Sequence, residues 1–535
     1  MSATTFTVTS TEELYDALSQ AVGGDRVELA AGDYTLDLSA KSGFDITYDA
    51  PVTITSADPG NAAVFSQMHL SGVSNLTIDN VVFDYTFAAG DPHWTRPFTV
   101  RESENVTIEN SLFEGDVASG VDDIVDGYGY GYALDISGST DILVASNEFT
   151  TWMRAILVGD SQNVDIVGND IHSIRSDGIN LAQVQSVLIE NNYIHDFRIA
   201  PGSGDHQDMI QMWTNGTSEP SRDVIVRGNT LDIGEGDATQ SIFMRNDQVD
   251  RGLAGPEMFY QDILIEENVI LNAHSHGITV GETDGLVVRN NSVLSADRAD
   301  LVPSINIATA STNVAIEENV TAAVNGHETQ SDWIVGNNAI VQNRDPDAAG
   351  YYETEFLTSS VDGRADGFIV DPESLTAQRE AGATRLQLDT APTSVKPAFD
   401  VNSDPDDAGV LVFDATQSYG PAGQVTEADA TFHWDFGDGT GATGQRVQHA
   451  YEVAGAHPVT LTVTFSDGTS VSTAAEIAVP GMDLLSFNGE TGRFVAEGFG
   501  QVSEIEGTNA ASVAFSGQQA LDLGASGTSL SIPRE

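Results

Sequence analysis

Cysteine is absent from this chain of 535 residues, and only two residues, Lys41 and Lys396, are lysines. The lack of cysteine excludes disulfide bonds, thiolate metal sites and a cysteine nucleophile. Cations of any kind are few: 21 lysines and arginines stand against 80 aspartates and glutamates, which gives a formal net charge of −59. This charge argues against nucleic acid as a partner, because nucleic-acid binding depends on cations that displace counterions from phosphates.

Long apolar segments are also missing. No run approaches the roughly 18 apolar residues of a membrane-spanning helix, so we predict no membrane contact. The first residues, Met1 to Thr5, lack the basic and apolar regions of a signal peptide. We therefore expect an extracellular monomer that is exported through a C-terminal signal outside these residues. The high acidity fits solubility in a saline medium.

An internal repeat runs through most of the chain. A phrase of alternating apolar residues that ends in asparagine recurs, and the shortest spacing, from Asn147 to Asn169, is 22 residues. Its asparagines are Asn80, Asn110, Asn147, Asn169, Asn191, Asn229, Asn268, Asn290 and Asn319. The period of two predicts strands. Asparagine tolerates the left-handed turn conformation, and it can hydrogen-bond to its counterpart in the next coil.

A second short strand lies between successive phrases, as at 155–158 and 178–181. Short strands at this spacing, without helices between them, predict a parallel β-solenoid. Residues 1–385 resemble the right-handed parallel β-helix of pectin- and alginate-active enzymes. A capping box at Ser10-Thr-Glu-Glu13 predicts a short helix that covers the N-terminal end of the solenoid.

Two further modules follow, so the whole chain is expected to be all-β. Residues 393–480 contain Trp434-Asp-Phe-Gly-Asp-Gly-Thr440 and His449-Ala-Tyr451. These motifs resemble the PKD family, an immunoglobulin-like β-sandwich. Residues 481–535 are rich in glycine and serine and contain short apolar strands. We expect a partial β segment there, similar to the start of a lectin-like jelly roll.

The predicted register of the second strand places a candidate binding site. Alternation directs one set of side chains inward and the next set toward solvent. The inward column reads Ile156, Ile179, Ile210, Ile242, Ile278 and Ile305. One outward column reads Leu157, Asn180, Gln211, Phe243, Thr279 and Asn306. The strands begin with the polar residues Arg154, Asp177, Asp208, Gln240 and His276. In the next outward column, Trp213 and Arg245 are predicted to form a sugar platform beside a cation.

Three insertions, at 198–207, 214–221 and 247–260, surround the same place. Long loops on a rigid scaffold tend to build the binding cleft. The first insertion runs into Gly204-Asp-His-Gln-Asp208, which holds two carboxylates and an imidazole. Residues 154–251 also hold seven of the chain's arginines. Arginine suits a carboxylated or sulfated sugar, because its guanidinium group pairs with such groups through two parallel hydrogen bonds.

The first interpretation is a lyase or C5-epimerase that acts on an acidic polysaccharide such as alginate or pectate. Both reactions begin with removal of the proton beside the uronate carboxylate. We predict His206 as the base, Arg245 or Arg175 as the cation that neutralises the carboxylate, and Asp205 or Asp208 as the group that orients His206. The predicted substrate contacts are Trp213, Gln211, Asn180, Arg154, Arg198 and His276.

The second interpretation is an inverting hydrolase. Ser176-Asp-Gly178, the motif around His206, and His274-Ser-His-Gly277 are similar to motifs of the polygalacturonases, glycoside hydrolase family 28. Asp177, Asp205 and Asp208 would then be the catalytic carboxylates. The third interpretation is a non-catalytic polysaccharide-binding or adhesive protein, with Trp213 as a platform.

Calcium is the one cofactor that the sequence suggests. Carboxylates that lie close in sequence suit this ion, which prefers oxygen ligands. The candidate ligands are Asp205 with Asp208, and Glu282 with Asp284.

Overall fold

The computed structural model describes residues 3–535 except 45, 122–123, 297–300, 329, 359–364, 388–396, 398, 405–406, 416–417, 421–422, 452–454, 466–467, 480–482, 489–492, 497–511, 515–519, 523–529 and 533–535. The chain divides into two compact units, Met1–Leu388 and Asp389–Glu535. No helix among the described residues is both long and apolar enough to cross a membrane.

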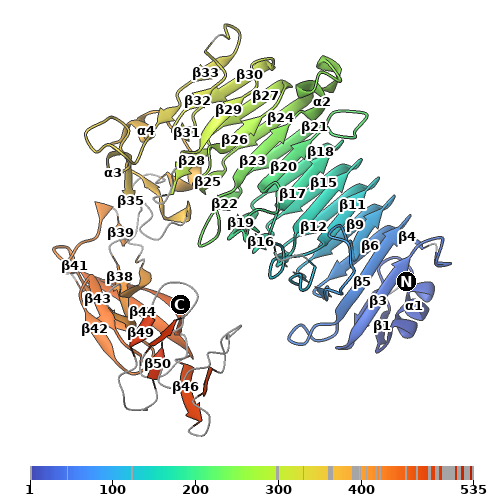
Figure 1. Cartoon of the computed structure of the whole chain (residues 1–535), viewed down its shortest axis with the longest axis horizontal. Coiled ribbons are helices and arrows are strands. Elements are labelled where there is room, and N and C mark those ends of the chain that lie inside the picture. Colours follow the sequence, from blue (N-terminus) through green and yellow to red (C-terminus); the bar gives the residue numbers. More distant parts are fainter. Residues whose placement is uncertain are drawn as a thin grey trace. The chain divides into compact units, whose positions relative to one another are not determined.

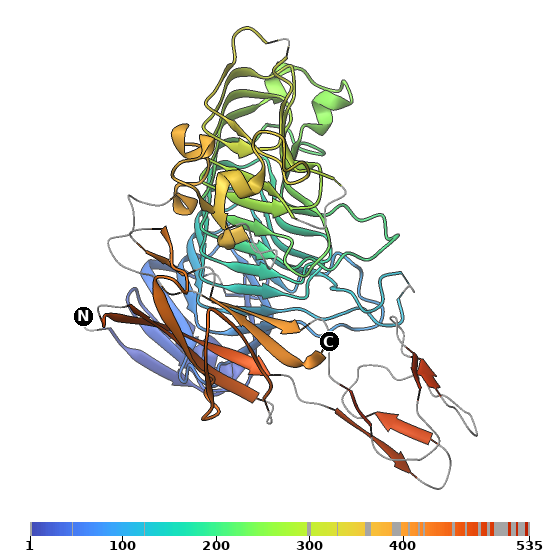
Figure 2. The same cartoon turned by 90° about the vertical axis from the view of Figure 1, so that its left-hand side faces the viewer.

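The first unit is a parallel β-helix in which three rows of parallel strands stack coil upon coil in sequence order (Figures 1 and 2). The first row comprises β1 (Thr5–Val8), β2 (Arg26–Leu29), β4 (Thr47–Ser56), β6 (Ser74–Asp79), β9 (Glu104–Glu109), β12 (Thr140–Ala145), β15 (Gln162–Val167), β18 (Gln185–Glu190), β21 (Arg222–Arg227), β24 (Tyr260–Glu266), β27 (Thr283–Arg289), β30 (Thr312–Glu317) and β33 (Ile334–Gly336). The second row comprises β3 (Asp33–Leu38), β5 (Val64–Ser71), β8 (Phe98–Arg101), β11 (Tyr132–Ser137), β14 (Arg154–Gly159), β17 (Asp177–Ala182), β20 (Asp208–Trp213), β23 (Gln240–Arg245), β26 (His276–Val280), β29 (Ser304–Ile307) and β32 (Val324–Asn325). The third row comprises β7 (Val82–Asp84), β10 (Leu112–Glu114), β13 (Glu148–Thr150), β16 (Asp170–His172), β19 (Tyr193–His195), β22 (Thr230–Asp232), β25 (Val269–Asn272), β28 (Ser292–Ser295), β31 (Val320–Thr321) and β34 (Ala339–Ile340).

The core of this unit consists of columns of identical or similar side chains. The predicted inward column is confirmed, because register pairs Ile156 with Ile179, Ile210 and their successors, and all six isoleucines are fully buried. In the third row, Phe113 stacks on Phe83 and on Phe149, with ring centroids 4.3 Å apart in both pairs. Each such buried side chain contributes about 1.5–3 kcal/mol to stability, and repetition of the pattern in successive coils extends the core along the solenoid.

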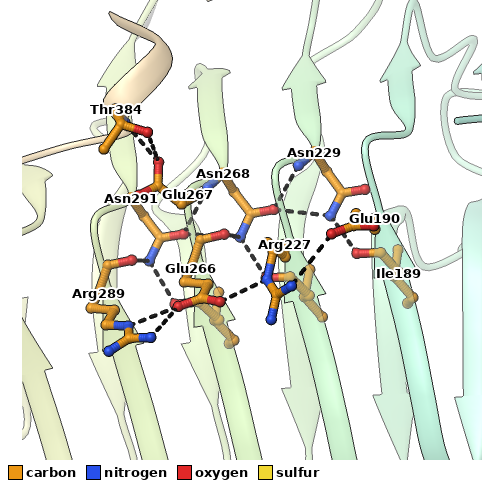
Figure 3. A network of polar contacts seen from close by, with 12 residues as sticks. Ile189, Glu190, Arg227, Asn229, Glu266, Glu267, Asn268, Arg289, Asn291 and Thr384 are labelled. Atoms are coloured by element: carbon orange, nitrogen blue, oxygen red, sulfur yellow. Dashed lines mark hydrogen bonds and ion pairs between the residues drawn. The ribbon is translucent and has the colours of Figure 1, made fainter. Parts of the chain in front are cut away.

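A ladder of buried asparagines forms the turn between the first and third rows (Figure 3). Its members are Asn147, Asn169, Asn192, Asn229, Asn268, Asn291, Asn319 and Asn338. The main-chain N–H and the Nδ2 of each asparagine donate to Oδ1 of the next, as from Asn229 to Asn268 at 3.0 and 2.9 Å. Nδ2 of Asn229 also donates to the carbonyl of Ile189 in the preceding coil at 2.9 Å. These amides are therefore fully used.

One asparagine per coil was predicted both to take the left-handed turn conformation and to hydrogen-bond to the next coil. In the structure, two neighbouring residues share these two roles. Asn191 and Asn290 take the left-handed conformation, with φ of 55° and 51°. The residues after them, Asn192 and Asn291, form the ladder. Elsewhere a different residue takes the left-handed position, such as Gly228 before Asn229, with φ of 65°.

Charged groups and the end of the first unit flank this ladder (Figure 3). Glu266, which is 8% exposed, accepts from Arg227 and Arg289 at 2.7 Å each. The N–H and hydroxyl of Thr384 donate to Glu267 at 2.6 and 2.8 Å. Arg385 donates to the main-chain carbonyl groups of Gly228 and Asn229 at 2.7 and 3.0 Å. The last described segment of the unit is thereby fastened to the turn.

Helices are short and lie at the ends or in loops of the solenoid. The predicted N-terminal helix is confirmed as α1 (Thr11–Gln20): Ser10 accepts a hydrogen bond from the N–H of Glu13, and Leu14, Ala17 and Leu18 are buried. The other helices are α2 (Asp247–Asp250), η1 (Pro256–Met258), α3 (Tyr352–Glu355), η2 (Ala365–Gly367), α4 (Leu375–Gln378) and η3 (Thr384–Leu386). The strands β35 (Phe356–Thr358) and β36 (Ile369–Val370) form an antiparallel pair near the end of the unit.

The second unit is antiparallel. Its first part comprises β37 (Asp400–Asp404), β38 (Asp407–Asp414), β39 (Tyr419–Gly420), β40 (Gly423–Gln424), β41 (Ala430–Asp435), β42 (Gly441–Thr443), β43 (Arg446–His449), β44 (Gly455–Phe465) and β45 (Ser470–Val479). The two motifs quoted above meet in its core. Trp434 donates through its indole N–H to the carbonyl of Gly444 at 2.8 Å, and the rings of Phe436 and His449 stack 4.0 Å apart. The Tyr451 hydroxyl donates to the carbonyl of Phe436 at 3.1 Å.

Short antiparallel strands follow. They are β46 (Asp483–Asn488), β47 (Arg493–Ala496), β48 (Ser512–Ala514), β49 (Ala520–Asp522) and β50 (Leu530–Ile532). The all-β class is therefore confirmed, whereas the boundaries 1–385, 393–480 and 481–535 and the jelly-roll likeness stay predictions.

Candidate functional site

Four of the polar residues predicted at the start of second-row strands form one column. Register pairs Arg154 with Asp177, Asp177 with Asp208, and Asp208 with Gln240. Asp177 and Asp208 are fully buried. The residue after Asp177 is Gly178, where a Cβ atom would lie only 2.5 Å from the carbonyl oxygen of the neighbouring strand. Glycine thus allows the backbone of β20 to approach directly behind Asp177.

His206 and Asp208 form a hydrogen-bonded pair at the centre of this column. The His206 Nδ1 lies 3.0 Å from Oδ2 of Asp208, and the Nε2 of Gln211 donates to the same oxygen at 2.5 Å. A carboxylate only accepts, so Nδ1 carries a proton and Nε2 is the nitrogen left for chemistry. The imidazole is 52% exposed, whereas Asp208 is buried. The hydrogen bond that His206 donates to Asp208 raises the pKa of His206, although partial burial acts in the opposite direction.

The second buried carboxyl, Asp177, lies one strand away. Burial raises the pKa of Asp177 to about 7, the nearby Asp208 adds to the increase, and Arg154 opposes it. The Nε of Arg154 is 3.0 Å from Oδ2 of Asp177. Burial also raises the pKa of Asp208. Two carboxyls buried side by side disfavour double ionisation, so this pair can hold a proton near neutral pH.

Arg154 connects the column to an aromatic surface. Its guanidinium lies over the rings of Tyr132 and Trp213, 5.3 and 5.9 Å from the centroids. Trp213 and Arg245 are register partners as predicted, but the cation over Trp213 is Arg154. The sequence analysis missed Tyr132, although it opens the strand that precedes Arg154 and is its register partner.

The two arginines proposed to neutralise a substrate carboxylate differ in access. Arg175 is 2% exposed, pairs through Nε with Asp205 at 3.0 Å, and donates to the carbonyl of Gly129 at 3.1 Å. Burial lowers its pKa, and Asp205 opposes this. Arg245 is 47% exposed and donates to Asp250 at 2.8 Å. Arg175 therefore holds a loop, and Arg245 is the one that a substrate can reach.

A pocket of about 400 Å³ adjoins His206 on the side of the later coils, on β23, β26, β29 and β32. Phe243 lines this pocket, and its ring centroid lies 5.8 Å from that of His206 and 5.1 Å from that of His276. The Nδ1 of His276 is 2.8 Å from the hydroxyl of Thr279. Glu282 lines the pocket, and burial raises its pKa.

Several oxygens of this site have no hydrogen-bond partner among the described residues. They are Oδ1 of Asn180, Oδ1 of Asp208, Oε1 of Gln240 and Oε2 of Glu282. The amide of Asn180 donates to Oε1 of Gln211 at 3.0 Å, so only its oxygen is unused. Buried polar atoms are normally paired, and a group of unpaired acceptors indicates a place where a ligand donates.

Two predicted residues lie apart from this group. Arg198 is exposed, and its side chain forms no ion pair with the described residues. Asp284 belongs to the first row and accepts from Thr312 and Asn313 at 2.9 and 2.6 Å. In the described part of the chain, no group of three His, Asp or Glu side chains is arranged to hold a metal ion. Calcium stays a prediction, and no step below uses it.

A group of charges on the earlier coils was not predicted. Asp135 is buried and accepts from Arg96 at 3.2 Å and from Arg101 at 3.0 Å. Asp135 belongs to the same outward column as Asn180, with Leu157 between them. This column position was the available signal, but the apolar Leu157 interrupts the polar series.

Comparison with known proteins gives the class of each part. Residues 98–244 match the family described as right handed beta helix region, and residues 394–479 match the PKD domain. The chain carries a right-handed β-helix and a PKD domain. No curated protein sequence matches it.

Solved structures similar to this β-helix protein have different activities. An alginate lyase from Paenibacillus sp. str. FPU-7 is 13% identical, covers 65% of this chain and 89% of its own, and has a TM-score of 0.28. The surface protein and adhesin PfbA of Streptococcus pneumoniae is 15% identical, and the match covers 61% of this chain and 92% of PfbA with a TM-score of 0.38. A family 28 exopolygalacturonase of Yersinia enterocolitica is 12% identical, and the match covers 64% of this chain and 72% of that enzyme with a TM-score of 0.28. Any assignment of activity therefore has to come from the site of this chain.

Proposed function

We propose that the β-helix is a polysaccharide lyase or C5-epimerase that acts on a uronate-containing polysaccharide. The observation that carries this proposal is the pair of a half-exposed His206 and a buried Asp208, 3.0 Å apart. The carboxylate fixes the proton on Nδ1 and leaves Nε2 as a base that faces solvent. Around it lie arginines and unpaired acceptor oxygens.

In the proposed reaction, Nε2 of His206 removes the C5 proton, and the C–H electron pair moves into the uronate carboxyl group as an enolate. Arg245 is the accessible cation that would stabilise this charge. In a lyase the pair then forms the C4–C5 double bond, the C4–O bond breaks, and the imidazolium proton passes to the leaving oxygen. In an epimerase a water molecule on the opposite face gives a proton to C5, and the imidazolium returns its proton to solvent.

The hydrolase interpretation has less support. Asp177 and Asp208 are fully buried on adjacent strands, which lie about 4.8 Å apart. An inverting pair needs carboxyl groups about 6.5–9.5 Å apart, with room for a water molecule. Asp205, the third candidate, is 16% exposed and paired with Arg175. The adhesive interpretation does not account for an oriented imidazole beside this pocket.

The test is turnover of a panel of uronate polysaccharides, followed by ultraviolet absorbance of unsaturated uronate, by deuterium exchange at C5, and by new reducing ends. We expect unsaturated product or exchange, and His206→Ala is expected to lower the rate about 10²–10⁴-fold. His172→Ala, on β16 of the third row, is the matched control and should keep the rate. Reducing ends with neither absorbance nor exchange would favour the hydrolase. Full turnover by His206→Ala would refute the proposed base. The acidic polysaccharide partner and the extracellular location belong to this proposal and stand or fall with it.

A further inference from the structure

The charges along the second row change sign at His206. On the earlier coils, Arg96 and Arg101 are 37% and 48% exposed, and both pair with one buried carboxylate, Asp135. Arg96 also lies over the ring of Tyr132, 5.2 Å from its centroid. Two partly exposed guanidinium groups thus share a single negative charge. The earlier coils of the second row thus have positive charge available for an anionic sugar.

The pocket on the later coils has the opposite balance. Its one cation, Arg245, is engaged by Asp250 at 2.8 Å and has Asp247 at 3.7 Å. Glu282 pairs with no cation in the described part of the chain, and its Oε2 is buried without a partner. His276 adds no positive charge near neutral pH, because burial lowers its pKa. Arg245 already serves the uronate in the proposed reaction, so a second carboxylate in this pocket would meet like charge and no further cation.

Neutral hydrogen-bonding groups complete the pocket. Nδ2 of Asn325 donates to Oδ1 of Asn306 at 2.8 Å, and Nδ2 of Asn306 lies 3.1 Å from the Thr279 hydroxyl, within donating distance. Phe243 supplies an apolar face. An uncharged sugar suits this lining. Its C–H groups pack against the Phe243 ring, and its hydroxyl groups hydrogen-bond to the amides and to the unpaired carboxyl oxygen of Glu282.

We infer that this site selects a polysaccharide in which a uronate alternates with an uncharged sugar. The uronate lies at His206 and the uncharged sugar lies in the pocket, where one of its hydroxyl groups donates to Glu282. This inference rests on the proposed function. Successive coils are about 4.8 Å apart, so a chain lying along the row passes from the positive side, over His206, into the pocket. A polymer of uronate alone would place a carboxylate beside Glu282.

The experiment compares two kinds of polymer under identical conditions. Polymannuronate and polygalacturonate are the uronate homopolymers, and hyaluronan and heparosan alternate glucuronate with an N-acetylated sugar. We expect kcat/KM at least about tenfold higher for an alternating polymer, because like charges juxtaposed in a pocket oppose binding. Glu282→Gln removes the charge and keeps an acceptor oxygen, and we expect the preference to fall about tenfold through better use of the homopolymer. Glu317→Gln, on β30 of the first row, is the matched control and should not change the ratio.

Binding provides a readout that does not need turnover. Calorimetry with His206→Ala and oligosaccharides of both kinds should show the same preference, which should be reduced in the His206→Ala/Glu282→Gln double variant. Equal or better use of homopolymers, with no effect of Glu282→Gln on the ratio, would overturn the inference and leave the proposed function intact. Failure to bind or turn over any uronate polymer would refute the proposed function and this inference with it.

Discussion

Asn229 in the ladder and Asn180 on the outer face of the second row are both at most 1% exposed, yet their amides are used differently. Asn229 accepts through Oδ1 from the main chain and side chain of Asn192 and donates to Ile189 and Asn268. Asn180 donates to Gln211, but its oxygen has no partner among the described residues. The same residue type therefore completes the scaffold in one place and leaves an acceptor unused in the other.

Carboxylates show the same contrast. Glu266 beside the ladder is held by Arg227 and Arg289 (Figure 3), whereas Asp208 and Glu282 each keep an unpaired buried oxygen. An unsatisfied buried polar atom costs about 1–3 kcal/mol. The gathering of such atoms around His206, and their absence from the ladder asparagines, separates the surface that binds from the turn that stabilises.

The largest effect on stability is expected from Asn229→Ala, which removes one member of the ladder. Truncation leaves the donors of Asn192 and the carbonyl of Ile189 without partners in a buried turn. We expect a loss of about 3 kcal/mol in the free energy of unfolding of the β-helix, measured by urea denaturation of the full chain. The rate of the folded enzyme should not change. A loss below about 1 kcal/mol would show that the ladder is not a stabilising element.

Asp208→Asn tests the candidate site around His206, where the expected loss is in activity. The variant should lower kcat/KM about a hundredfold. Asp208 raises the pKa of His206, and Asp177 adds to this while Arg245 opposes it. The neutral base forms as pH rises through that pKa, so without the Asp208 charge the acid limb of the rate profile should move to lower pH. An unmoved limb would mean that another group is the base.

Asn180→Ala is the direct counterpart of the ladder variant. Its oxygen has no partner to lose and its amide loses only the hydrogen bond to Gln211, so we expect a loss of about 1 kcal/mol in the free energy of unfolding. Under the proposed function this oxygen accepts from the substrate, so its loss should lower kcat/KM about tenfold. A stability loss as large as that of Asn229→Ala, with full activity, would remove the distinction between the two sites.

The smallest effect is expected from Arg385→Ala. The exposed guanidinium fastens the end of the first unit to the ladder turn through Gly228 and Asn229. We expect a loss of at most about 1 kcal/mol in thermal unfolding experiments. Arg446→Ala, which removes a pairing with Asp414 in the second unit, is the control and should leave the β-helix transition unchanged.

The alternation of side chains along the strands was enough to predict which residues point into the core and which residues pair between coils. The isoleucine column and the pairing of Asn180 with Gln211 follow from alternation and from burial of one face, and both are present. Contacts made by loops could not be predicted in this way. Arg175 is buried and donates to the carbonyl of Gly129, 46 residues earlier, and no local pattern carries that information.

Turn geometry accounts for the remaining differences. Glu282 and Asp284 are two residues apart, but the chain enters the first row between them, so one lines the pocket and the other lies in β27. The split of the asparagine roles has a similar origin, because each ladder asparagine directly follows the left-handed residue of the turn.

The ladder also has a direction that bears on synthesis of the protein. Each asparagine donates its main-chain N–H and Nδ2 to the coil that follows and its remaining Nδ2 hydrogen to the coil that precedes, as Asn192 does with Asn229 and Ile166. During synthesis from the N-terminus, the last coil made therefore carries an asparagine whose main-chain N–H and Nδ2 have no acceptor yet. Each newly made coil brings the acceptor oxygen for these donors, so the ladder allows the chain to fold coil by coil from its N-terminus.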